Sequence, residues 1–284
     1  ATRAAALRLL PAEALPELNR FNPLVRGPGP LAETAIDKLL AHPDSDRIEL
    51  LAALAVDLEM ARPRRLEAIS GLNPTGQRDL LVRLTAEAGP VRNEALRVLA
   101  MAPVAEETQK KLSGLKDSPL LRRVLGRPFA DHPAPGDLPG WEKALAGRGN
   151  PETGRRVFFG IGLCSTCHRH HHRGARTGPD LSRIGAGADR RELLKAIVQP
   201  SAEVAPRYQL WRIHSAGQTV VGFHADTRSG RQIFVDVDGR RHRFKAEAVT
   251  ERQPLPGSVM PPGLLHRLTL SEARDLLTFL IDSK

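Results

Sequence analysis

Short apolar stripes at helical spacing, broken at brief intervals by Pro, Gly and Asn, run through residues 1–126 of this chain. The segments Asp46–Ala61, Gln77–Ala88 and Val91–Met101 carry apolar residues three or four positions apart, which is the period of an amphipathic helix. The Pro and Gly residues between the stripes stop each helix after a few turns. The pattern therefore predicts a domain of short antiparallel helices over residues 1–126.

This half of the chain resembles HEAT-type helical repeats. The repeats are degenerate and show no strict period, so an irregular helical domain is the alternative. Residues 127–149 are rich in Pro and Gly and predict a linker, with a short helix over Trp141–Ala146.

From Asn150 to Lys284 helix signals return. Asn150 is a good N-cap and Pro151 suits the first helical position, which predicts a helix to about Phe159. A second helix is expected over Asp189–Gln199.

The last helix has the clearest start signal. Thr269 and Glu272 form a capping box before an apolar run, whose buried face we expect to carry Leu276, Leu277, Phe279 and Leu280. Gly154 and Phe158 share one face of the helix that begins near Asn150. A glycine there permits close approach of another helix, and we expect Phe279 to be its partner.

Between the second and last of these helices lie four short β-prone runs, separated by Gly217, Ser229–Gly230 and Asp238–Gly239. The runs are Tyr208–His214, Thr219–His224, Gln232–Val237 and Arg241–Lys245. They predict a small antiparallel meander, over about residues 208–250, inserted into a mainly α-helical domain that spans residues 150–284.

Composition narrows the classes of partner. The formal net charge is +10, but the 42 Lys and Arg residues are scattered and form no long basic tail. Aromatic residues make up only 4% of the chain, which disfavours a base-stacking surface. No apolar run reaches the length of a membrane helix. We therefore expect neither nucleic-acid binding nor a membrane span in this chain.

Residues 164–168 read Cys-Ser-Thr-Cys-His and contain both cysteines of the chain. Two thiols at this spacing can form thioethers to the vinyl groups of one haem c, with His168 as an axial ligand of its iron. The motif could instead be a redox dithiol, or part of a zinc site completed by His170, His171 and His172. A two-cysteine chain cannot form a disulfide framework.

A second group of signals concerns the ligands of that iron. The carbonyl of Pro179 can accept the imidazole N–H of His168 and so orient the ring, although an ordinary turn is the alternative. Met260 lies in a stretch too rich in Pro and Gly for a helix, and a rigid loop can present its thioether as the second axial ligand. Met60 and Met101 are expected in the helical core. His214, His224, His242 and His266 are the alternatives to Met260 as second axial ligand, but most of them are expected at the surface. His170–His172 are expected in a solvated loop.

Together these stretches resemble a class I cytochrome c domain, and more closely the haem-binding domain of planctomycete- and verrucomicrobial-type proteins. The matching stretches are Gly154–Phe158, Cys164–His168, Gly178–Ser182, Gln199–Ser201, Ser258–Pro261 and Asp275–Leu280. The resemblance implies one covalent haem c, contact of Leu181 with it, and a β insertion before the methionine loop. It also implies an exported, periplasmic-type bacterial protein with a redox partner or dehydrogenase domain.

Electron transfer is therefore the leading hypothesis, with His168 and Met260 as the two iron ligands. If Met260 is not bound to the iron, the chain is instead an open-site haem enzyme or gas sensor, in which His224 or Arg176 would matter. The helical half could also be a docking scaffold. The sequence contains no Gly-rich phosphate loop and no Gly-x-Ser-x-Gly elbow, so nothing in it predicts an enzyme outside haem chemistry.

Overall fold

The computed structural model describes residues 2–10, 15–127, 129–215 and 217–284. Ala1 and residues 11–14 of the predicted first domain, Pro128 of the predicted linker and Ala216 of the predicted sheet lie outside the described residues. The chain forms two compact units, Ala1–Ala130 and Asp131–Lys284. Residues 131–149, which we expected to act as a linker, therefore belong to the second unit.

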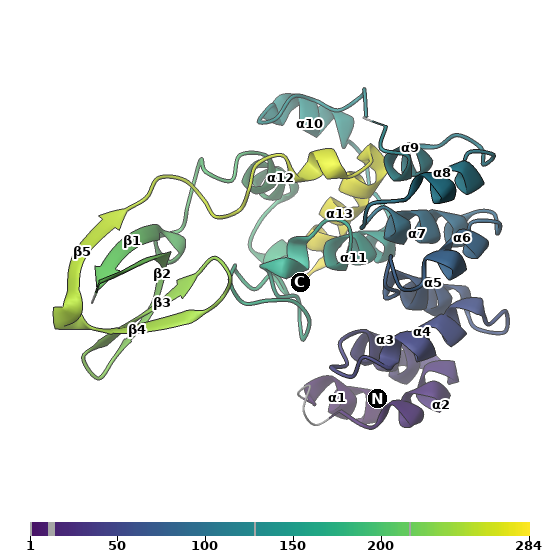
Figure 1. Cartoon of the computed structure of the whole chain (residues 1–284), viewed down its shortest axis with the longest axis horizontal. Helices are drawn as coiled ribbons and strands as arrows, with labels where there is room; N and C mark the ends of the chain where they lie inside the picture. Colours follow the sequence, from purple (N-terminus) through teal and green to yellow (C-terminus); the bar gives the residue numbers. More distant parts are fainter. Residues whose placement is uncertain (1, 11–14, 128, 216) are drawn as a thin grey trace. The chain divides into compact units, whose positions relative to one another are not determined.

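The first unit is a stack of short helices, seen as the purple-to-blue column in Figure 1. They are α1 Thr2–Leu9, α2 Phe21–Arg26, α3 Gly29–Leu40, α4 Arg47–Val56, α5 Arg62–Ser70, α6 Arg78–Leu84, α7 Pro90–Leu99, α8 Glu106–Leu112 and α9 Pro119–Val124. Helices α3, α5, α7 and α9 contact one another in turn, and α2, α4 and α6 each pack on the odd-numbered helix that follows. The unit is thus a two-layered array of helical hairpins.

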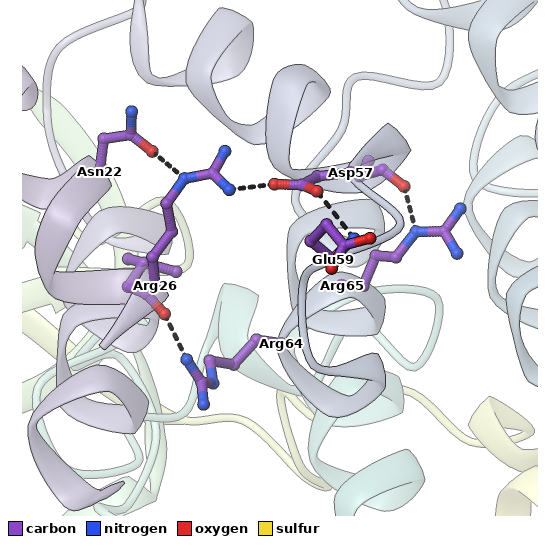
Figure 2. Close-up of polar contacts among 8 residues, drawn as sticks. Asn22, Arg26, Asp57, Glu59, Arg64 and Arg65 are labelled. Carbon is purple, nitrogen blue, oxygen red and sulfur yellow. Dashed lines mark hydrogen bonds and ion pairs between the residues drawn. The ribbon is translucent and has the colours of Figure 1, made fainter. Parts of the chain in front are cut away.

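Arginine side chains of α5 tie this helix to neighbouring helices of the array (Figure 2). Arg64 donates to the carbonyls of Val25 and Gly27, at 2.5 and 2.7 Å, where α2 ends. Arg65 donates to the carbonyl of Ala55 at 2.7 Å, near the end of α4. The last carbonyls of a helix have no partner within it, so these arginines supply hydrogen bonds that the helices need.

An ion pair at the surface also joins α2 to the turn after α4. Figure 2 shows Arg26 of α2 between Asn22 and Asp57, with Nε of Arg26 2.8 Å from Oδ1 of Asn22. Arg26 pairs with Asp57 in the turn after α4, and this pairing lowers the pKa of the Asp57 carboxyl. Exposed pairs of this kind contribute little stability each.

The apolar stripes of the sequence form the core of this unit. Its largest fully buried side chains include Phe21, Leu39, Leu51, Leu54, Ile69, Leu81, Leu96 and Leu99. The three predicted helices are present as α4, α6 and α7, but each ends earlier than expected. Met60 is buried, as expected, whereas Met101 is 38% exposed, so the prediction of a core position for Met101 is wrong.

The helical part of the second unit contains α10 Leu138–Ala144, α11 Pro151–Phe159, α12 Arg190–Val198 and α13 Leu270–Asp282. Asn150 caps α11 through the N–H of Thr153 at 2.9 Å, and the predicted capping box of Thr269 and Glu272 begins α13. Helix α11 packs closely on α13 because Gly154 has no side chain: a Cβ there would overlap the carbonyl oxygen of Asp275 and lie 2.8 Å from Cβ of Phe279. The expected Gly154–Phe279 contact is confirmed.

Residues 131–149 pack onto this helical part. Trp141 of α10 is fully buried, with its ring centroid 5.2 Å from that of His266 and 5.5 Å from that of His132. His132 is also 2.8 Å from the carbonyl of Leu268, just before α13. A segment rich in Pro and Gly is therefore an ordered part of the unit.

The inserted sheet is antiparallel, with strands β1 Leu210–Ser215, β2 Gln218–Arg228, β3 Arg231–Asp236, β4 Arg241–Lys245 and β5 Val249–Pro254. Its order is β4-β3-β2-β1-β5, so the predicted four-stranded meander is present and an unpredicted fifth strand pairs with β1. Ser229 and Gly230 both have positive φ in the two-residue turn between β2 and β3, which the right-handed twist of a hairpin favours.

Candidate functional site

The Cys-x-x-Cys-His segment is separated from α11 by residues 160–163 and begins in a single 3₁₀ turn, η3 Cys164–Thr166. The N–H groups of Cys167 and His168 both donate to the carbonyl of Cys164, at 3.3 and 2.8 Å. Residues three apart in such a turn lie on the same side of it. The local hydrogen bonds therefore hold the two cysteines on one side of a tight turn, with His168 directly after it.

The next loop folds back over this turn. The N–H of Ala175 donates to the carbonyl of Ser165 at 2.9 Å, and the N–H of Gly178 to that of Cys167 at 2.7 Å. Gly174 has a φ of +93°, and a Cβ on it would overlap the His168 carbonyl oxygen. A Cβ on Gly178 would lie 2.8 Å from Cε1 of His168. Both glycines are needed because the backbone packs directly against His168.

One hydrogen bond determines the chemistry of the His168 ring. Nδ1 of His168 is 2.9 Å from the carbonyl oxygen of Pro179, the contact expected from the sequence. A carbonyl can only accept, so Nδ1 carries the proton and Nε2 keeps its lone pair. Burial lowers the pKa of His168, and the bond to Pro179 only partly opposes this. His168 is thus a neutral imidazole with Nε2 able to bind a metal.

The two cysteines are free thiols, and burial raises the pKa of Cys164 to about 12. Thiol–disulfide exchange requires a thiolate, which redox dithiols obtain by lowering the pKa of the attacking cysteine. The surroundings of Cys164 act in the opposite direction. The burial of Cys164 therefore gives the redox-dithiol hypothesis no support.

The described residues also offer no set of ligands for the zinc site considered above. In the described ranges, no three His, Cys, Asp or Glu side chains gather where they could hold a metal ion. His171 and His172 are exposed. His170 is buried, with Nε2 2.9 Å from Oγ of Ser283 and its ring centroid 4.6 Å from that of Phe279. The prediction of a solvated loop is wrong for His170, which anchors the loop to the end of α13.

The remaining predicted site residues lie on separate segments. Leu181 is half-buried and donates its N–H to the carbonyl of Arg169 at 2.8 Å, which ties it to the segment after His168. Met260 is half-buried on an irregular loop, with its N–H 3.1 Å from Oγ of Ser258. The N–H of Ser258 in turn donates to Ser201, after α12. The loop is therefore held at its backbone, and the pairing of Met260 with His168 across one iron stays a prediction.

The histidines of the sheet have partners near them. His214 lies 2.8 Å from Oγ1 of Thr219, His224 lies 2.9 Å from Oγ1 of Thr227, and His242 lies 2.7 Å from Oδ2 of Asp236. His266 is 3.0 Å from the carbonyl of Pro133. These contacts occupy one ring nitrogen of each histidine, while Nδ1 of His266 is buried with no hydrogen-bond partner among the described residues.

Compared with models of protein families and with curated proteins, the sequence matches none of them. No helix among the residues that the structure describes is long and apolar enough to cross a membrane.

Proposed function

We propose that this chain is an electron-transfer protein carrying one covalent haem c, attached through Cys164 and Cys167 and ligated by His168. The observation that carries the proposal is the hydrogen bond from Nδ1 of His168 to the Pro179 carbonyl, beside two free thiols in one turn. A metal-ligating histidine almost always donates its other ring N–H in this way. The unit that contains the site is proposed to be a cytochrome c-like domain.

Each residue of the site has a distinct role in this proposal. The two thiols form thioethers, which tether the group whatever the oxidation state of its iron. Pro179 fixes the tautomer of His168 and makes Nε2 a stronger donor. Gly174 lets the loop close against the His168 carbonyl, and Gly178 lets it close against the ring, which holds the ring in place. A bound haem supplies a one-electron redox change, and no proton-transfer pair is required.

Met260 is the proposed second axial ligand. Its loop contains Pro256, Pro261 and Pro262, which restrict the backbone and lower the entropy lost on ligation. A thioether is a soft, weakly donating ligand and favours ferrous iron. The open-site enzyme or sensor is the competing function and differs from this one only at Met260.

The two-layered array of helical hairpins in the first unit supports a HEAT-like identity for it. Arrays of this kind expose extended surfaces that can bind protein partners. We propose that it docks a redox partner or a dehydrogenase domain, and that the protein works in an exported, periplasmic-type compartment.

Pyridine haemochrome analysis of the chain, matured in a host with a c-type haem assembly system, tests the central claim. We expect a spectrum of doubly thioether-linked haem, and haem that stays on the protein through acid–acetone extraction. Cys164→Ser with Cys167→Ser should abolish this attachment, whereas Ser165→Ala, between them, should retain it. Complete extraction of haem from the matured wild-type chain would refute the proposal.

A further inference from the structure

A cavity of about 1270 Å³ lies between the Cys-x-x-Cys-His loop and one end of the sheet. Thr166, Cys167 and residues 175–177 form one wall. The other wall comes from residues 206–208 and from parts of all five strands, including Trp211, Phe223, Val235, Arg241 and Arg252. The insertion therefore faces the attachment loop across an open cavity that is somewhat larger than the roughly 300–1,000 Å³ of a typical small-molecule site.

This cavity adjoins the proposed attachment site at Cys167 but does not include the proposed iron ligands. Cys167 lines it, but His168, Pro179, Leu181 and Met260 are not among the described residues that do. Because His168 is not part of the lining, we expect the iron that its ring would bind to lie outside the cavity. If Cys167 carries the haem thioether, as the proposed function requires, a molecule in the cavity would lie next to that thioether.

The walls carry excess positive charge. Four guanidinium groups line the cavity, those of Arg176, Arg207, Arg241 and Arg252, against the single carboxylate of Asp238. Arg252 lies 3.9 Å from the ring centroid of Trp211, and Arg207 lies 5.2 Å from that of Tyr208. Within the described ranges, no carboxylate forms an ion pair with any of the four. Their donors remain available to an anion, and arginine binds carboxylates in a two-point fork.

The walls are also unusually aromatic for this chain. Aromatic residues make up 4% of the sequence, yet its only tyrosine, one of its two tryptophans and Phe223 all line the cavity. Val237, in the turn after β3 and in the same lining, is 49% exposed, although valine is most often buried. Flat rings and an exposed aliphatic surface fit a ligand with a planar apolar body.

We propose that this cavity is a binding site for a small organic anion with an aromatic body and a carboxylate group. The guanidinium groups of the loop and the sheet hold the carboxylate, and the aromatic residues cover the ring. The site is built from the chain's own residues and goes beyond the proposed electron transfer.

Isothermal titration calorimetry of the full haem-loaded chain with 2-naphthoate tests the site, and 2-naphthalenemethanol is the uncharged comparison. The wild-type chain should bind the carboxylate and not the alcohol. Arg176→Gln and Arg241→Gln should each weaken binding by about tenfold, the effect of losing one charged hydrogen bond. Arg243→Gln is the matched control: it is exposed on the same strand, two residues from Arg241, and does not line the cavity. It should leave the affinity unchanged.

Three results would overturn the site: no binding of 2-naphthoate, equal binding of the alcohol, or an affinity that neither arginine change alters. The Soret band must stay constant during the titration, because a carboxylate on the iron would shift it and refute the location. If the arginine changes shift the reduction potential of the ligand-free protein but not the affinity, the guanidinium groups hold the haem propionates and the site is refuted. The chain could fail to acquire covalent haem in a host with a c-type assembly system and still bind 2-naphthoate. That result would refute the proposed function but support the binding site.

Discussion

At the scale of single residues, His168 depends on backbone atoms more than on side chains. A carbonyl fixes its protonated nitrogen, and the backbone of two glycines packs against it. Because these partners are main-chain groups, few substitutions can alter them without moving the loop. Glycine substitutions are the ones that add atoms where the ring now lies.

Gly178→Ala is the sharpest test of this packing. The new Cβ would lie 2.8 Å from Cε1 and 2.9 Å from Nδ1 of His168, so the ring must move and its bond to Pro179 must weaken. Loss of such a supporting bond usually lowers metal affinity by about 10- to 100-fold. We expect a mixture of high-spin and low-spin haem in the visible spectrum and a raised reduction potential. Gly187→Ala, which has open space around it, should behave as wild type.

Met260 separates the two candidate functions. Met260→Ala should open the iron to cyanide and carbon monoxide. Met260→His should keep six-coordinate haem and lower its reduction potential, within the roughly 0.8 V that axial ligands span. The measurement is the sulfur–iron charge-transfer band of the oxidised protein. Its absence from the wild type would favour the open-site function, whereas its survival in Met260→Ala would show that another sulfur ligates the iron and would refute Met260 as the ligand. Met101→Ala is the control, because Met101 is exposed on the first unit.

At the scale of elements, start signals were the most reliable feature. Asn150, Asp189 and Thr269 all cap helices, because a cap depends on residues within three positions of it. Helix ends in the first unit were less predictable, since tertiary contacts decide where they stop. Strand β5 was missed because its residues are almost all exposed and polar, as is common at the edge of a sheet.

The contact between α11 and α13 gives an element-scale prediction. In Gly154→Ala the added methyl group meets the Asp275 backbone, which cannot move aside as a flexible side chain could. Overpacking costs about 1–3 kcal/mol, and a Cβ that overlaps the Asp275 carbonyl oxygen puts this substitution in the upper part of that range, at about 2–3 kcal/mol, against a gain of about 1 kcal/mol in helix propensity. We expect a net loss of about 1–2 kcal/mol, seen as a Tm roughly 3–6 °C lower for the second unit. An unchanged Tm in Gly154→Ala, with Gly187→Ala as reference, would contradict the close packing.

At the scale of the whole molecule, the positions of prolines in the first unit reveal a repeat that its apolar pattern does not show. Pro30, Pro63, Pro90 and Pro119 each lie in the first two positions of α3, α5, α7 and α9, the helices that contact in sequence. Proline is favoured there because the first N–H groups of a helix need no intrahelical partner. These prolines would have indicated the array before the structure did.

The boundary of the second unit can be tested by truncation. Asp131–Lys284 should fold alone and keep the spectrum of the full chain. Asn150–Lys284, which lacks Trp141 and His132, should lose about 3–5 kcal/mol, the usual effect of removing a buried tryptophan. Thermal unfolding followed by haem absorbance measures both. Trp141→Ala in the full chain should reproduce the loss, and equal stability of the two fragments would show that residues 131–149 are a linker after all.

Local chemistry could be predicted from the sequence alone: the Cys-x-x-Cys-His turn, the caps of α11, α12 and α13, four strands of the sheet and the carbonyl partner of His168. Each depends on residues close in the chain, where few conformations compete. Only the tertiary structure decided that residues 131–149 pack as part of a unit, that His170 is buried, and that arginine and aromatic residues meet above Cys167. These features join residues as much as 136 positions apart, as His132 and Leu268 show, and such contacts leave no periodic signal in the sequence because packing of the whole unit selects them.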